Sequence, residues 1–256
     1  MTDSDPDSDS TPGSEAGPER PARPLALDAY ETLADGYAER APTKPFNADL
    51  ERPATRSLLP DVDGLDVFDA GCGPGITTEQ LVQEGANVVA GDVSPQMLRH
   101  ARERVGSDAD FLRLDLGSPF PLADDSVDLV HASLCFDYVE DWHALFAEVA
   151  RVLRPGGQVV CSMHHPFAEA TRLEPENYFE TQSFSEAWTG FGDPVDVPFY
   201  YRPLGGRLGP MLAAGFQLVD LVEAQPTEQF REKRPEAYER VSREPTFLAV
   251  RGVLGG

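Results

Sequence analysis

Two kinds of hydrophobic pattern alternate along the chain. In residues 25–37 the apolar side chains recur every three or four positions, which predicts a helix that Pro42 and Pro45 end. Residues 50–59 form a further stretch with helical spacing. Short apolar runs bounded by turn residues then predict strands at residues 65–69, 87–91, 111–114, 127–133, 158–163, 216–222 and 246–253.

Helical patterns follow the first, second and fourth of these strands, the first of them over residues 76–84. Ser94 and Pro95 provide an N-cap and a first helical position for a helix over residues 95–105. An apolar face over residues 142–153 predicts another helix, closed by Arg154-Pro155-Gly156-Gly157. Strands that alternate with helices favour a parallel sheet with right-handed crossovers. After a helix over residues 207–214, a turn-rich stretch between the last two strands lets these pair antiparallel. We therefore expect an α/β fold with a doubly wound sheet of seven strands, mostly parallel with an antiparallel last strand.

Two segments lie outside this alternation. Residues 1–24 consist mainly of Asp, Ser, Pro, Thr and Gly, so we expect a disordered acidic tail before a domain that spans residues 25–256. Residues 164–204 are rich in aromatic residues, Pro and Gly. We interpret this segment as a lid-like insertion, and an irregular surface connection is the alternative.

The charge balance of the chain indicates its cellular environment and its partners. The chain has 44 acidic and 21 basic residues, a net charge of −23, and only Lys44 and Lys233 as lysines. Because net charge acts on solubility, this balance suggests a halophilic, cytoplasmic protein. It also argues against a nucleic-acid partner, which needs a basic surface. That argument weakens in molar salt, where screening shortens to about 3 Å.

The cysteines, the N-terminus and the apolar runs agree with the expected cytoplasmic location. Cys72, Cys135 and Cys161 are far apart and form no C-x-x-C pair, so we expect neither a disulfide framework nor a bound metal. The acidic N-terminus lacks the apolar core of a signal peptide. No apolar run approaches the roughly 20 residues of a membrane span.

A glycine-rich turn follows the first strand, in the sequence Asp-Ala-Gly-Cys-Gly-Pro-Gly at residues 69–75. Ile76 stands where a dinucleotide-binding fingerprint requires glycine, and the carboxylate of Asp69 suits a cationic or amine-bearing ligand. Asp92 and Asp115 follow the second and third strands, so all three acids should meet at one edge of the sheet. Asp92 could accept both hydroxyls of a ribose, and Asp115 could accept from an exocyclic amine. Singly, each would be explained as a helix cap or a loop acid.

Five segments, in this order, give the chain a specific resemblance to the class I S-adenosylmethionine-dependent methyltransferases, in the branch called methyltransferase type 11. They lie at residues 69–75, 91–98, 114–115, 126–130 and 153–157. The resemblance implies a Rossmann-like fold and S-adenosyl-L-methionine as cofactor. It implies that Asp69, Gly71 and Gly73 hold the methionyl end of the cofactor, Asp92 the ribose and Asp115 the adenine. The other cofactor contacts that we expect are Val93, Met97 and Leu116 around the adenine, Tyr37 over the methionine part, and Ser133 at the end of the fourth strand. Tyr37 packed against the sheet is the structural alternative.

Methyl transfer needs alignment more than a strong catalyst, and a general base only when the acceptor arrives protonated. His164 and His165 directly follow the fifth strand and are our candidate catalytic residues, although such a pair can also serve only to hydrogen-bond a loop. Tyr200, Tyr201 and Arg202 end the insertion and could grip an anionic or carbonyl-bearing acceptor.

We therefore expect a methyltransferase that acts on a small molecule, because an aromatic lid with few bases suits a partly apolar acceptor. The alternatives are a methyltransferase for tRNA or a protein, and a non-catalytic regulatory protein that binds S-adenosylmethionine. The acceptor, the atom methylated and the oligomeric state stay open.

Overall fold

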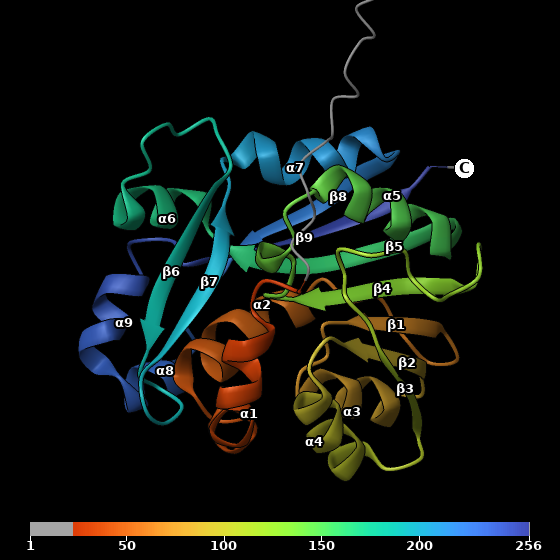
Figure 1. Cartoon of the computed structure of the whole chain (residues 1–256), viewed down its shortest axis with the longest axis horizontal. Helices are drawn as coiled ribbons and strands as arrows, with labels where there is room; N and C mark the ends of the chain where they lie inside the picture. Colours follow the sequence, from red (N-terminus) through yellow and green to blue (C-terminus); the bar gives the residue numbers. More distant parts are fainter. Residues whose placement is uncertain (1–22, 256) are drawn as a thin grey trace, which may run out of the picture.

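A seven-stranded sheet forms the centre of the molecule (Figure 1). The structure is a computed structural model and describes residues 23–255. The strands follow the order β3-β2-β1-β4-β5-β9-β8, and β9 runs antiparallel to both of its neighbours. Their bounds are β1 Asp66–Ala70, β2 Asn87–Asp92, β3 Ala109–Arg113, β4 Val127–Ser133, β5 Leu153–His164, β8 Phe216–Glu223 and β9 Phe247–Leu254. The predicted fold class is thus confirmed. The expected disordered tail falls on residues 1–24, of which the structure describes only Arg23 and Pro24.

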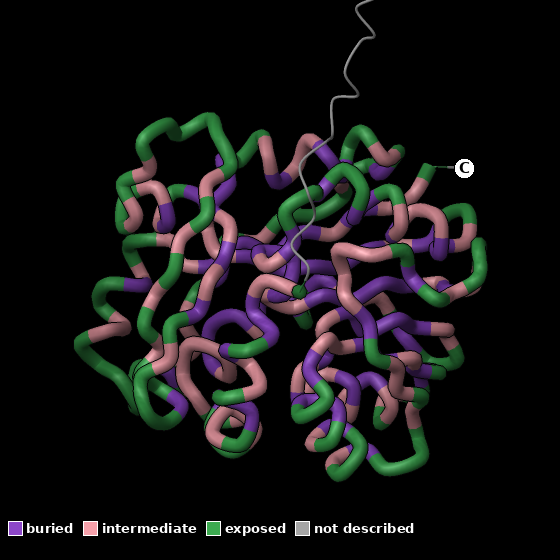
Figure 2. Tube along the Cα trace, viewed as in Figure 1, coloured by how far each residue is buried: buried purple, intermediate pink, exposed green. Residues whose placement is uncertain are grey.

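Successive side chains of the strands pack into two cores, one on each face of the sheet. Val67 of β1 joins the core that also holds residues of α3 (Ile76–Gln83) and α4 (Pro95–Val105). Its neighbour Phe68 joins the opposite core, with residues of α5 (Trp142–Val152) and α7 (Leu204–Ala213). Figure 2 shows buried residues concentrated along these central strands. The alternation follows from the two-residue period of a strand, and it covers both faces of a parallel sheet with helices.

Local signals explain where several helices begin. The Ser94 Oγ accepts from the Met97 N–H at 3.1 Å, so Ser94 caps α4 as expected, and Pro95 is its first residue. The stretch between β8 and β9 is less irregular than we expected. It contains α8 (Glu228–Lys233) and α9 (Pro235–Val241), because the Thr227 Oγ1 accepts from the Phe230 N–H and Pro235 begins α9.

The segment expected to end the fifth helix belongs to β5 instead. Helix α5 ends at Val152, and Leu153 already pairs with Val127 of β4. The next paired residues are Leu129 and Gln158, so residues 154–157 bulge out of the strand. Gly156 permits this with a φ of 80°, in the left-handed region.

The segment that we interpreted as an insertion has its own regular structure. It contains α6 (Pro166–Leu173) and an antiparallel hairpin of β6 (Gln182–Trp188) and β7 (Val195–Tyr201), which is separate from the main sheet (Figure 1). Phe191 and Val197 of this hairpin region pack with Leu33 of α1 (Leu27–Arg40). Near the start of the chain, α1 is followed by a π-helical turn, η1 (Asn47–Glu51), and by α2 (Arg52–Arg56). These lead into β1, the first strand of the sheet. Among residues 23–255, no helix combines the length and the apolar character that a membrane crossing requires.

Candidate functional site

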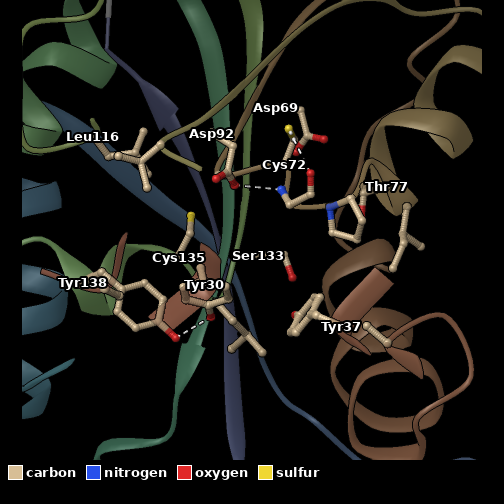
Figure 3. Close-up of a pocket in the computed structure, with 18 of the residues that line it drawn as sticks. Tyr30, Tyr37, Asp69, Cys72, Thr77, Asp92, Leu116, Ser133, Cys135 and Tyr138 are labelled. Atoms are coloured by element: carbon tan, nitrogen blue, oxygen red, sulfur yellow. Dashed lines mark hydrogen bonds between the residues drawn. The ribbon is translucent and has the colours of Figure 1, made fainter. Parts of the chain in front are cut away.

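The three strand-end acids meet at one cavity. Asp69 lies near the end of β1, Asp92 ends β2, and Asp115 follows β3 by two residues. All three line the same cavity, which the side chains of α1 close from the other side (Figure 3). The convergence follows from the parallel arrangement, because the carboxyl ends of neighbouring strands lie at the same edge of the sheet.

The glycine-rich turn shapes this cavity. Gly71 and Gly73 have φ values of 68° and 54°, which L side chains rarely adopt. A Cβ on Gly71 would lie 2.5 Å from the Cβ of Cys135, whereas a Cβ on Gly73 would meet no protein atom within 4 Å. The backbone at Gly73 therefore leaves open space in which a ligand can approach it.

Backbone groups hold Asp92 in place. Its Oδ2 accepts from the Gly73 N–H and its Oδ1 from the Ser94 N–H, both at 2.9 Å, and Figure 3 shows it facing the cavity. Burial raises the pKa of Asp92 to about 6, although these two hydrogen bonds act to lower it. Each carboxylate oxygen can accept a second hydrogen bond, so Asp92 can still receive ligand hydroxyls.

Asp69 is held by side chains rather than by the turn. Its Oδ2 accepts from the Thr78 hydroxyl at 2.6 Å, and its Oδ1 lies 2.8 Å from the Nδ1 of His131. Both partners are buried. Asp69 thus joins β1, β4 and α3 below the glycine-rich turn, and it also lines the cavity.

The structure brings together nine of the ten residues that we expected to contact a cofactor. The residues that line the cavity are Tyr37, Asp69, Gly71, Gly73, Asp92, Val93, Asp115, Leu116 and Ser133. Met97 does not line it. Its side chain is buried on α4, the helix that begins at Pro95.

Four of the lining residues that the sequence analysis did not assign to the site have hydrogen-bonding side chains that bear on its shape. Glu51 is buried, and its Oε1 accepts from the hydroxyls of Thr55, Ser133 and Ser162 at 2.7, 2.9 and 2.6 Å. Its position in a helical stretch carries no signal of this role. His131, Tyr30 and Tyr138 also line the cavity, and the two tyrosine hydroxyls lie 2.7 Å apart (Figure 3). Tyr30 carried only the signal of an apolar position in the first helix.

A second cavity adjoins the first. The two share the lining residues Tyr30, Tyr37, Asn47, Leu134 and Tyr138. The second cavity has a volume of about 790 Å³, against about 140 Å³ for the first. Its volume falls within the roughly 300–1,000 Å³ typical of small-molecule sites. Its other walls come from α6, the β6–β7 hairpin, and the region from Arg234 to Phe247.

His164 lines the second cavity and is tied to a buried ionic network. Its Nδ1 lies 3.1 Å from the Oδ2 of Asp137. The buried guanidinium of Arg207 binds the other oxygen of Asp137 at 2.5 Å and also binds Glu169. Burial alone would raise the pKa of Asp137, but the charges of Arg207 and His164 bring it well below its ordinary value. Asp137 is thus an anion that orients the His164 ring.

Asp137, His164 and Glu169 have potential metal-ligand atoms within 4.8 Å of one another. The guanidinium of Arg207 already binds both carboxylates there, so a cation would have to displace it.

His165 has a different position. Its Nδ1 accepts from the Phe167 N–H at 3.2 Å, and its Nε2 lies 3.0 Å from the Oε1 of Glu223. It lines neither cavity. These contacts make His165 the N-cap of α6 and leave it outside both cavities, although it directly follows β5.

Tyr200, Tyr201 and Arg202 also line neither cavity. Tyr201 is fully buried, and its hydroxyl donates to the Tyr178 carbonyl. The guanidinium of Arg202 lies 4.9 Å from the ring centre of Trp142 and donates to backbone carbonyls before α5. Arg202 thus attaches the end of β7 to the main domain, and none of the three residues faces a cavity, where we expected acceptor contacts.

Comparisons with known proteins agree on one family. Residues 68–161 match the family described as a methyltransferase domain. A crystal structure of an S-adenosylmethionine dependent methyltransferase from Mesorhizobium loti is 31% identical, with a TM-score of 0.65 over 79% of this chain and 97% of that chain.

Two curated relatives are similar over part of the chain. A malonyl-[acyl-carrier protein] O-methyltransferase of Pectobacterium atrosepticum is 34% identical over 132 residues, which is 50% of this chain and 51% of the relative. A trans-aconitate 2-methyltransferase of Azoarcus is 37% identical over 127 residues, or 48% of this chain and 49% of the relative. The chain thus spans about half the length of these curated relatives.

Proposed function

Since the chain belongs to the S-adenosylmethionine-dependent methyltransferases, as the sequence motifs predicted, we propose that it transfers a methyl group from S-adenosylmethionine to a small molecule bound in the second cavity. The observation that carries this proposal is the junction of the two cavities. The first contains the open glycine turn and three strand-end acids, and the second has the volume of a small-molecule site. The relative named for trans-aconitate, a small molecule, supports a compact acceptor.

The first cavity fits the cofactor in shape and charge. Asp92 would accept from the ribose hydroxyls through its remaining lone pairs, Asp115 would accept from the adenine amine, and Gly73 leaves room for the ligand beside its backbone. When bound, S-adenosylmethionine supplies a methyl group on a positively charged sulfur. Four acids and one arginine line this cavity, so its negative potential favours a cationic ligand: Glu51, Asp69, Asp92 and Asp115, with Arg52.

The tyrosines at the junction separate the cofactor side from the acceptor side. Tyr30 and Tyr138 form a hydroxyl pair there, and Tyr37 packs at 4.6 Å between ring centres against Phe191. Helix α6 and the hairpin complete the wall of the second cavity. In this proposal the segment from 164 to 204 acts as the lid, which holds the acceptor in line and excludes water.

His164 is the base for an acceptor that must lose a proton. Its Nδ1 faces the anionic Asp137, which favours the tautomer with the proton on Nδ1 and leaves Nε2 free to accept one. Asp137 is a positioning residue, because it acts through His164 and lines neither cavity.

Binding of S-adenosylhomocysteine by calorimetry tests the cofactor assignment. We expect Asp92→Ala to weaken binding by about tenfold or more, because a hydrogen bond to a charged group contributes roughly 1.5–3 kcal/mol. Asp110→Ala is the matched control, since Asp110 is an exposed acid on β3 that does not line the first cavity. Equal affinity of wild type and a folded Asp92→Ala protein would refute the assignment.

Transfer of labelled methyl to fractionated cell extract tests the acceptor class. We expect label in the small-molecule fraction. Label in tRNA or protein would support the other enzymatic readings, and binding of S-adenosylhomocysteine without transfer to any fraction would support a regulatory protein.

A further inference from the structure

The two adjoining cavities differ in the sign of their charge. The charged residues that line the first are four carboxylates and one arginine. The second is lined by four cationic residues, in a chain whose net charge is −23: Lys44, Arg172, Arg234 and Arg240. This cluster of cationic residues is notable because the chain has only 21 basic residues against 44 acidic ones.

Three of the four cations have no acidic partner within the described residues. Arg172 pairs with Glu186, which also lines the cavity. No ion pair within 23–255 involves Lys44, Arg234 or Arg240.

The acids of this cavity do not neutralise these three charges. Glu169 is bound by Arg207 and Glu186 by Arg172. Glu244 is the remaining carboxylate in the described lining, so the second cavity keeps an excess of positive charge.

Lys44, one of the two lysines of the chain, lies against an aromatic ring. Its Nζ lies 3.7 Å from the centre of the Phe191 ring. Burial lowers the pKa of Lys44, and the positive charge of Arg234 lowers it further, so these two cations are close enough to repel each other. The other lysine, Lys233, pairs with Asp49 at 2.7 Å. An anion bound between Lys44 and Arg234 would relieve this repulsion.

The rest of the second cavity is largely aromatic. Phe46, Trp188 and Phe247 line it together with Phe191. Arg234 and Arg240, at the start and within α9, are exposed, so they lie at the rim of the second cavity. The tyrosines that the second cavity shares with the first form a different part of its wall. This arrangement suits a molecule with an apolar body and a charged end.

We propose that Lys44, Arg234 and Arg240 bind an anionic oxygen group, a carboxylate or a phosphate, on the methyl acceptor, whose apolar body packs against the aromatic wall. The proposal rests on the proposed function, since it assigns the acceptor to the second cavity. Arginine forms paired hydrogen bonds with either anion, and lysine adds a point charge.

The test measures binding of model acids to the full chain saturated with S-adenosylhomocysteine. The probes are phenylsuccinate, its uncharged dimethyl ester, and phenyl phosphate, each titrated by calorimetry at one KCl concentration at which all variants are folded. The test variant is Arg234→Gln/Arg240→Gln. The control variant is Arg231→Gln/Arg243→Gln, which removes two exposed arginines from the same region that line neither cavity and pair with Glu228 and Glu239.

We expect one or both acids to bind the wild type and the control, and to lose about tenfold or more in affinity in the test variant. Preference for phenylsuccinate or for phenyl phosphate identifies the anionic group. The proposal is overturned if neither acid binds, if the ester binds as tightly as the acid, or if both double variants lose affinity equally. Binding of S-adenosylhomocysteine itself is measured first, so failure of the proposed function shows as loss of that signal.

Discussion

Asp92 shows at the scale of one residue how burial sets the conditions for binding. Its pKa is raised to about 6, so the folded protein favours the protonated carboxyl more than an unfolded chain does, whereas a ribose needs the ionised acceptor. We therefore expect the affinity for S-adenosylhomocysteine to fall about tenfold as the pH falls from 7 to 5. Calorimetry across this range checks it, and Asp92→Asn should be weak and nearly independent of pH. A wild-type profile as flat as that of the variant would contradict the role of Asp92.

The two neighbouring histidines give a second test at this scale. His164→Asn should lower the rate of methyl transfer about 10²- to 10⁴-fold for an acceptor that must lose a proton, because it removes the base. His165→Asn should leave the rate nearly unchanged, since asparagine can also cap α6. Single-turnover transfer measures both, and S-adenosylhomocysteine affinity should be unaltered in each. A similar loss of rate in both variants would instead indicate a shared structural role.

At the scale of elements, the buried Arg207 joins three parts of the fold. From α7 it binds Asp137 of η2 (Phe136–Tyr138) and Glu169 of α6, so it attaches the insertion to the main domain. Arg207→Gln should lower the free energy of unfolding by about 3–5 kcal/mol, because it leaves buried carboxylates without their cation. Urea denaturation at neutral pH measures this loss. Arg243→Gln breaks an exposed pair and should cost less than about 1 kcal/mol. Similar losses in both variants would show that the network does not stabilise the fold.

For the molecule as a whole, the net charge of −23 predicts a dependence on salt. Repulsion between exposed acids reaches about 30 Å at 0.01 M salt but only about 3 Å at 1 M. We expect the melting temperature to fall as KCl is diluted from molar to millimolar concentration. Calorimetric scans measure it, with sucrose in place of KCl as a control for effects of solute other than screening. A melting temperature that stays constant or rises on dilution would contradict a halophilic adaptation.

Features that depend on neighbours in the chain were predicted from the sequence. The glycine-rich turn, the Ser94-Pro95 cap and the strand-helix alternation each rest on local conformational preferences. The meeting of Asp69, Asp92 and Asp115 followed as well, because parallel strands bring their carboxyl ends to one edge. The helices α8 and α9 had signals in Thr227 and Pro235 that we gave too little weight.

The sequence by itself therefore determined the family, the sheet and the edge of the sheet at which the three acids meet. Only the tertiary structure decided which side chains face that edge. His164 in the second cavity and His165 in a helix cap are consecutive residues, and no periodicity distinguishes them. Lys44 and Arg234 come together from distant segments, and Arg202 turns inward against Trp142. Such contacts depend on how α1, α6 and α9 pack over the sheet, and long-range packing of this kind leaves no pattern in the local sequence.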